Sequence, residues 1–301
     1  MNKNLVPFVG SSDFANQMRG LTENLSKDNA SVLLIGERGT GKRLISQHIH
    51  YAAAKNFGYF FEINCKSFDN CQILQAFSTV EKLIDLNQKI TLFLCFADEL
   101  NDELQRLFLA FFYRIAKKGL NIKIICSVEN SLEEKVSKGL FIPDLYYRLN
   151  SVVLNVLPLR QRKEDILPIA QNYVKIFSKK SGYKFIDFSQ EAKDLMLNKL
   201  WKGNADELIN AVQRAFIVGK PPLIKSADLG IENFNSFSEE ISERSEDDKT
   251  LKKATETFKK EYVTKILEEN SWNQTKAAKV LGIQRTYVIK LINELDIRKN
   301  K

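Results

Sequence analysis

The chain has 301 residues, of which 44% are hydrophobic and 27% are charged, and its formal net charge is +8. This length predicts one large folded domain and one or two small ones. No apolar run reaches the roughly 18 residues of a membrane span, and residues 1–30 show neither a signal-peptide nor a transit-peptide pattern. We therefore expect a cytoplasmic protein with no membrane partner.

The few cysteines and histidines limit the chemistry open to the chain. The four cysteines include no C-x-x-C pair, so the sequence predicts free thiols instead of a zinc site or a disulfide framework. The two histidines, His48 and His50, fall in one predicted helix, which argues against histidine catalysis and histidine metal sites. We expect no metal site. The cysteines are Cys65, Cys71, Cys95 and Cys126.

In chain order, Phe14, Met18 and Leu21 recur at helical spacing, and residues 31–35 form a short apolar segment typical of a buried strand. The next segment, GERGTGK, fits the phosphate-loop pattern G-x-x-x-x-G-K, and helical spacing returns after it. Such a loop turns backbone N–H groups and the positive end of the following helix towards a polyphosphate. A glycine-rich turn without a ligand is the alternative. The predicted ligand is ATP or ADP, and the predicted binding residues are Gly36, Glu37, Gly39, Thr40, Gly41, Lys42 and Arg43.

Arg43 departs from this pattern. The position after the loop lysine would carry a Ser or Thr whose hydroxyl holds a magnesium ion. An arginine cannot supply that oxygen. The sequence therefore supports phosphate binding by Lys42 more strongly than metal-assisted hydrolysis, and it weakens the case for magnesium.

Strand and helix patterns then alternate up to Pro158. This alternation predicts an α/β domain over residues 1–158, with a parallel sheet and the phosphate loop at the carboxyl end of its first strand. After Pro158 we expect no further strands and a helical lid over residues 159–230. The further strands are expected at residues 58–64, 89–97 and 121–128, and the helices at 71–86, 100–116, 164–179, 189–200 and 205–217.

The last part of the chain combines a linker with a basic tail. Residues 231–249 are rich in Ser, Glu and Asp, which predicts a flexible acidic linker. Residues 250–301 predict an amphipathic helix at 251–270 followed by a helix-turn-helix in which Gly282 makes the turn. From residue 270 onward, seven Lys or Arg residues outnumber two acidic ones, a local net charge of +5. This excess of positive charge indicates a polyanion partner, and a merely solvated basic face is the alternative. The side chains expected to face double-stranded DNA are Asn273, Thr275, Lys276, Gln284, Arg285, Thr286, Tyr287 and Lys290.

A family resemblance emerges from motifs that recur in order. On these motifs the chain resembles, from Val9 to Leu229, the AAA+ domain of bacterial enhancer-binding proteins, the NtrC-like sigma-54-dependent activators. The tail resembles the Fis-type helix-turn-helix. The resemblance implies a P-loop sheet with a helical lid, an all-α DNA-binding domain, and DNA and RNA polymerase as partners. The motifs are Val32-Leu-Leu-Ile-Gly-Glu-Arg-Gly-Thr-Gly-Lys42, Phe61-Glu-Ile-Asn-Cys65, Thr91-Leu-Phe-Leu94, Leu157-Pro-Leu-Arg160 and Trp201-Lys-Gly-Asn204.

The resemblance also exposes a departure at the catalytic carboxylates. In the family, an Asp-Glu pair directly follows the equivalent of Thr91-Leu-Phe-Leu94, and Cys95 and Phe96 stand there in this chain. Asp98 and Glu99 come three residues later and align with the family pair only through an insertion and a deletion. Three extra strand residues would also displace the carboxylates by about 10 Å. We therefore favour the ungapped alignment, which leaves no catalytic residue assigned.

Further losses point the same way. The polar sensor position after the fourth strand falls at Glu129, with Asn130 one residue away as the alternative. The first interface arginine falls at Ile142 and leaves Arg148, and the arginine of the lid falls at Asp206. An acidic side chain near a triphosphate repels the charge that an arginine would attract. Residues 64–91 are also too few to hold the GAFTGA loop by which the family engages sigma-54. We expect little or no ATP turnover.

Three hypotheses follow. The first is a DNA-binding transcriptional regulator with a nucleotide-binding but hydrolysis-deficient AAA+ domain, which docks onto RNA polymerase or a related active regulator. The second is an active ATPase that activates sigma-54 RNA polymerase or remodels a partner, with Asp98, Glu99 and Arg148 as its catalytic residues. The third is a structural oligomerisation partner with weak, non-specific DNA affinity. The helix at 251–270 predicts a dimer through the C-terminal domain, or alternatively a cap on the tail's own core.

Overall fold

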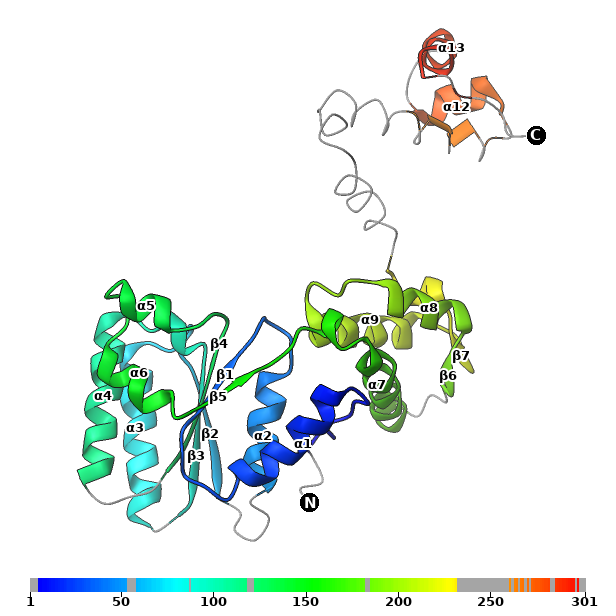
Figure 1. Cartoon of the computed structure of the whole chain (residues 1–301). Coiled ribbons are helices and arrows are strands. Elements are labelled where there is room, and N and C mark those ends of the chain that lie inside the picture. The colour runs from blue at the N-terminus through cyan, green and yellow to red at the C-terminus, as the bar shows by residue number, and fades with distance from the viewer. Residues whose placement is uncertain are drawn as a thin grey trace. The chain divides into compact units, whose positions relative to one another are not determined.

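The computed structural model divides the chain into two units, Met1–Ile231 and Glu232–Lys301, and each is described by itself (Figure 1). No helix among the described residues has the length and apolar composition needed to cross a membrane. The described residues are 5–52, 58–86, 88–117, 122–181 and 185–231 in the first unit, and 260, 263–264, 266–267, 270, 272–281, 285–295 and 297 in the second.

The first unit is built on a sheet of five parallel strands in the order β2-β3-β4-β1-β5 (Figure 1). β1 lies between β4 and β5, with Val32 opposite Ile125 of β4. β3 lies between β2 and β4, and its last residue, Cys95, stands opposite Asn64 and Ser127. The predicted α/β parallel sheet is confirmed. The strands are β1 (Val32–Ile35), β2 (Tyr59–Asn64), β3 (Ile90–Cys95), β4 (Lys123–Val128) and β5 (Val152–Asn155).

Helices cover both faces of this sheet (Figure 1). Leu33 of β1 belongs to the core shared with α3, α4 and α6, whereas Val32 and Leu34 pack with α1 and α2. The two sets separate because successive strand residues point to opposite faces. Since both faces are buried, β1 is apolar along its whole length. The helices are α1 (Asp13–Leu25), α2 (Lys42–Ala52), α3 (Asn70–Asp85), α4 (Asp102–Lys117), α5 (Glu133–Ser137) and α6 (Pro143–Leu149).

A helical lid completes the first unit, as the sequence predicts. Its helices enclose a separate apolar core around the fully buried Trp201, whose indole N–H donates to Met196 O at 2.7 Å. Ser189 caps the second lid helix, since its hydroxyl accepts from Ala192 N at 3.3 Å. The lid helices are α7 (Ile166–Ser181), α8 (Gln190–Asn198) and α9 (Asn204–Val218).

The expectation that no strands follow Pro158 was wrong, and one strand of the main sheet was missed. β6 (Asp187–Phe188) and β7 (Leu223–Ile224) pair in parallel within the lid, and β5 forms the edge of the main sheet. Strands of two residues are too short to show a period of two. β5 has only four residues, and one of them is the polar Asn155. The strand predicted at 89–97 also ends earlier, at Cys95.

The second unit contains the two predicted helices of the tail, α12 (Gln274–Leu281) and α13 (Arg285–Glu294). Ala277 and Ala278 of α12 and Val288 of α13 are buried in one small core. Of the linker predicted at 231–249, residues 232–249 lie outside the described residues, as do most of the helix predicted at 251–270 and the turn at Gly282. From the earlier helix, Val263, Ile266 and Leu267 belong to this core.

Candidate nucleotide-binding site

The phosphate loop follows β1 directly and leads into α2, which begins at Lys42. Gly39 and Gly41 have φ angles of +71° and +97°, in the left-handed region that favours glycine. A Cβ on Gly39 would lie 2.2 Å from Gly203 O, so this position needs a glycine for both conformation and space. The loop predicted from the sequence is therefore present at the carboxyl end of the first strand.

Lys42 is folded against the loop that precedes it. Its side chain is buried, and its ammonium donates to Gly36 O and to Glu37 O at 2.5 and 2.8 Å. Burial lowers the pKa of this ammonium, while the nearby charge of Glu129 opposes the shift. A polyphosphate in the loop would offer this ammonium oxygens that carry a full charge in place of two carbonyls.

The loop is fixed to the lid by Glu37 and Asn204. The Glu37 carboxylate accepts from the Arg160 guanidinium at 2.8 and 2.5 Å and from Asn204 Nδ2 at 3.1 Å. These hydrogen bonds, the one from Arg160 first, lower the pKa of Glu37 to about 2. At the start of α9, Ala205 N donates to Gly39 O at 2.9 Å. These hydrogen bonds fix the position of the loop relative to the lid.

A second tie joins the loop to the segment that precedes α1. The buried Arg162 guanidinium donates to Thr40 O at 2.6 Å and lies 3.7 Å from Asp165 and 5.0 Å from the Phe14 ring centre. Asp165 in turn accepts hydrogen bonds from Ser12 N and Oγ at 2.9 and 2.8 Å. The segment before β1 and the segment after β5 thus meet beside the loop.

A cavity of about 280 Å³ opens where these segments meet. Its wall includes Thr40 and Gly41 of the loop and apolar side chains from three segments. Two residues of the wall, Asn172 and Arg162, each carry a buried nitrogen without a hydrogen-bond partner, Nδ2 and Nε respectively. Unpartnered buried donors are costly, and a ligand with acceptors in an aromatic base or a ribose would satisfy them. The wall therefore fits a nucleotide. Its apolar side chains include Val9, Ile169, Tyr173 and Ile209.

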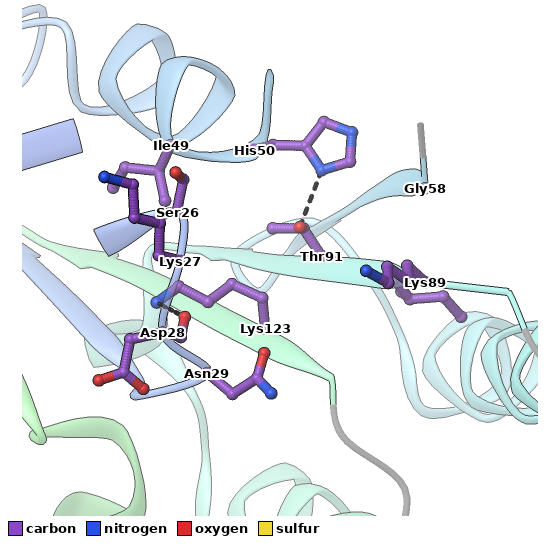
Figure 2. A pocket seen from close by; sticks show the side chains of 11 residues that line it. Ser26, Lys27, Asp28, Asn29, Ile49, His50, Gly58, Lys89, Thr91 and Lys123 are labelled. Atoms are coloured by element: carbon purple, nitrogen blue, oxygen red, sulfur yellow. Dashed lines mark hydrogen bonds between the residues drawn. The ribbon is translucent and has the colours of Figure 1, made fainter. Parts of the chain in front are cut away.

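A second cavity, of about 360 Å³, lies at the opposite, amino-terminal ends of β3 and β4 (Figure 2). Its buried polar groups satisfy one another: His50 Nδ1 lies 2.8 Å from Thr91 Oγ1, and Lys123 Nζ donates to Asp28 O and Ala30 O at 2.9 and 2.6 Å. Among the described residues, none of the buried side-chain atoms without a partner lies in this wall. The cavity at the phosphate loop is the better candidate for a binding site.

The end of β3 has no carboxylate. Cys95 closes the strand, and burial raises the pKa of its thiol against an opposing hydrogen bond with Ser127. Phe96 follows in the left-handed conformation, with a φ of +57°, and turns the chain into a 3-10 helix at Ala97–Glu99. The groups in direct line with the strand are therefore a neutral thiol and a phenyl ring.

The acidic pair of the alternative hypothesis lies beyond this turn. Asp98 is buried, its Oδ2 accepts from Glu129 N at 3.4 Å, and its Oδ1 has no partner. Burial raises the pKa of this carboxyl. Glu99 is exposed. Arg148, the third residue of that hypothesis, lies on α6 with its guanidinium 4.3 Å from the Tyr113 ring centre.

Two arginines beside the loop are paired with carboxylates. Arg43 Nε and Nη2 lie 2.9 and 2.8 Å from Glu62 Oε2 of β2. Arg38 pairs with Glu129, and its guanidinium lies 5.6 Å from the Phe96 ring centre. In the part of the chain that the structure describes, no group of three or more His, Cys, Asp or Glu side chains could hold a metal ion.

The residues expected to face DNA lie on α12 and α13. Asn273 has a local role as well, because its Oδ1 accepts from Thr275 N and Lys276 N at 3.1 and 3.2 Å at the start of α12. Lys290 pairs with Glu294 at 3.4 Å. Gln284 and the side chain of Tyr287 lie outside the described residues. The predicted DNA-facing side chains that are exposed are Asn273, Thr275, Lys276, Arg285, Thr286 and Lys290.

Sequence reasoning missed the residues that complete the cavity. Asn172 and Arg162 line the cavity from a distant part of the chain and belong to none of the quoted motifs. Glu62 lies within the motif Phe61-Glu-Ile-Asn-Cys65, but nothing in that motif indicated its contact with Arg43. Arg160 and Asn204 do end two motifs, Leu157-Pro-Leu-Arg160 and Trp201-Lys-Gly-Asn204. A polar residue that ends such a motif was the available signal for contact with the loop.

Three family matches cover most of the chain. Residues 8–155 match the sigma-54 interaction domain, residues 160–248 match the AAA+ ATPase lid domain, and residues 255–289 match the Fis family of bacterial regulatory proteins. The regulatory protein AtoC of Escherichia coli K12 is 30% identical over 298 residues, which is 92% of this chain and 65% of that protein. The sigma-54-dependent transcriptional regulator SfnR of Pseudomonas fluorescens is 27% identical, over 93% of this chain and 86% of that protein.

Solved structures share the fold. NtrX of Brucella abortus in complex with ADP matches with a TM-score of 0.63 and 23% identity, over 96% of this chain and 69% of that one. A RuvB variant of Thermotoga maritima matches with a TM-score of 0.54 and 13% identity, over 96% and 91% of the two chains. The chain spans about two thirds, 63–65%, of the length of the first curated relatives it matches.

Proposed function

Because this chain belongs to the family of sigma-54-dependent regulators, we propose that it is a DNA-binding transcriptional regulator whose AAA+ domain binds ATP or ADP without hydrolysing it efficiently. DNA binds to the helix-turn-helix, through exposed side chains such as Arg285 and Lys276. RNA polymerase, or a related active regulator, is the partner on which it acts. A dimer forms through the C-terminal domain.

Nucleotide binding is supported by the phosphate loop and by the wall of its cavity. The loop brings backbone N–H groups and the Lys42 ammonium together at the start of α2. Asn172 and Arg162 supply donors that lack partners. NtrX of Brucella abortus was crystallised with ADP and with ATP on the same fold. Together these observations make the cavity the nucleotide site of this proposal.

The proposal that hydrolysis is inefficient is carried by one observation. β3 ends at Cys95, and Phe96 follows it in the left-handed conformation. Attack by water on a phosphoryl group needs a carboxylate that positions the water and charges that stabilise the transition state. A neutral thiol and a phenyl ring supply neither. Asp206, in the wall of the cavity, adds a negative charge beside the phosphates.

The mode of contact with RNA polymerase also differs from that of the family's activators. α3 is one uninterrupted helix, Asn70–Asp85, and residues 65–69 are all that joins it to β2. No protruding GAFTGA loop is present in this segment. The absence of this loop favours docking onto a related active regulator over direct engagement of sigma-54.

An active ATPase is the second candidate, and one observation favours it. Asp98 Oδ1 is buried and unpartnered, and the Asp98 charge acts on Lys42 in the loop. An unpartnered carboxylate near a phosphate loop is a feature of a working site. In this hypothesis Asp98 and Glu99 form the catalytic pair.

DNA recognition is tested by selecting random-sequence duplexes on the full chain and sequencing those that bind. Enrichment of one site supports a regulator. Uniform, strongly salt-dependent binding supports a structural partner with non-specific affinity and contradicts the proposal. An Arg285→Ala variant, which removes an exposed side chain of α13, serves as the specificity control.

A further inference from the structure

We propose that the site binds its nucleotide without a divalent metal ion, and that the Arg43 guanidinium takes the place of the metal. The inference deepens the proposed nucleotide binding and rests on it. The fold family implies magnesium at this position. The residues present do not suit that ion, and they suit an arginine.

The ligands that magnesium needs are missing at the loop. Mg²⁺ requires oxygen ligands in a near-octahedral arrangement. The position after Lys42 carries a guanidinium instead of a hydroxyl, and the end of β3 carries a thiol. The nearby Asp98 offers a single carboxylate, whose Oδ2 accepts from Glu129 N at 3.4 Å and whose Oδ1 has no partner. Among the described residues, no group of three or more His, Cys, Asp or Glu side chains could hold a metal ion.

Arg43 is placed to bind phosphate oxygens. It is the second residue of α2, next to Lys42, and it lines the same cavity as Thr40 and Gly41. Its side chain is 65% exposed, so the guanidinium can move from one partner to another. A guanidinium carries a fixed positive charge and a planar set of donors that match phosphate.

Glu62 holds that guanidinium at the site in the free protein. Both Nε and Nη2 of Arg43 contact the same oxygen, Glu62 Oε2, at 2.9 and 2.8 Å. A polyphosphate offers Arg43 several charged oxygens in place of this one. A divalent cation at this position would instead be repelled by the Arg43 guanidinium, because like charges a few ångströms apart disfavour each other.

The test is calorimetric titration of the full chain with ADP in excess Mg²⁺ and in EDTA. We expect the Kd in EDTA to equal the Kd in Mg²⁺ or to lie below it. Arg43→Ser should weaken binding in EDTA by about tenfold, the loss expected for charge-assisted hydrogen bonds. Glu62→Gln should tighten it a few-fold, because it frees Arg43. The matched control is Arg106→Ser, an exposed arginine of α4 that pairs with Asp102 at 3.0 Å.

The outcomes separate this inference from the proposal beneath it. ADP binding that strengthens at least about tenfold with Mg²⁺ would overturn the metal-free site and leave nucleotide binding intact. An Arg43→Ser variant that binds like wild type in EDTA would also overturn it. Failure of the wild-type chain to bind ADP in either buffer would overturn both. Thermal unfolding of each variant checks that it is folded.

Discussion

Glu37 of the phosphate loop and Arg160 at the start of the lid form a bidentate ion pair, with N–O distances of 2.8 and 2.5 Å. Asn204 of α9 adds a third hydrogen bond to the same carboxylate, at 3.1 Å. A change in the shape of the loop would therefore break these contacts or move the lid. In the proposed function, this couples nucleotide binding to the arrangement of the lid.

The Glu37 carboxylate makes the stability of the first unit depend on acid pH. Its pKa is lowered from 4.5 to about 2, chiefly by the Arg160 hydrogen bond, so the ionised form stabilises the fold above pH 4.5. This contribution is lost as pH falls from 4.5 towards 2. Both side chains are more than a third exposed, so we expect less than about 1 kcal/mol. Urea unfolding at several pH values in this range gives the free energy of unfolding as a function of pH. This free energy should change less steeply with pH in Glu37→Gln than in wild type, and as steeply as in wild type in the exposed Glu103→Gln.

Gly39 should not tolerate a side chain. Gly39→Ala places a Cβ 2.2 Å from Gly203 O in a left-handed residue, which costs about 1–2 kcal/mol from conformation alone. We expect lower thermal stability and loss of ADP binding. Gly20→Ala is the matched control: a Cβ there meets nothing within 4 Å, and in mid-helix it should stabilise by about 0.5–1 kcal/mol. Equal behaviour of the two variants would contradict the described loop.

Asn172 should contribute more to nucleotide affinity than to stability. Its Nδ2 is buried in the cavity without a partner, so Asn172→Ala should weaken ADP binding by about 1 kcal/mol while the free energy of unfolding changes less. Ser178 on α7 offers the control, because its Oγ is also unpartnered and it does not line this cavity. Ser178→Ala should leave both quantities unchanged. If Asn172→Ala bound ADP normally, the base or ribose would lie elsewhere.

DNA binding should depend on the tail and not on exposed charges of the first unit. Arg285→Ala removes an exposed side chain of α13, and we expect a loss of about 1–3 kcal/mol on a selected site. Lys276→Ala should weaken binding to all sequences and reduce the salt slope by about one. Arg106→Ala in the first unit is the control. Fluorescence anisotropy at several salt concentrations measures all three, and an unaffected Arg285→Ala variant would move recognition away from α13.

The periodicity of the sequence was sufficient to predict the main elements. The apolar strand before Gly36 and the helix from Lys42 are where the alternation predicts them, and so are the lid helices. These elements could be predicted because each depends on neighbours in the chain. β6 and β7 could not, since a two-residue strand exists only through its partner, as Asp187 does opposite Leu223.

The site was predictable only in part, for the same reason. The loop from Gly36 to Lys42 is a local motif. The donors of Asn172 and the Arg43–Glu62 pair depend on which helices and strands meet, and no spacing in the sequence reports that. The end of β3 was predictable only approximately. Apolar residues continue past Cys95 in the sequence, so the left-handed conformation of Phe96, which ends the strand, is visible only in the structure.

Steady-state ATP turnover by the purified full chain at high concentration, with Lys42→Ala as the blank, decides whether the AAA+ domain hydrolyses ATP. The proposal predicts a rate equal to the blank, because a thiol and a phenyl ring stand at the end of β3. Turnover above the blank that Glu99→Gln abolishes would contradict it, and would make Asp98 and Glu99 the catalytic pair of an active ATPase.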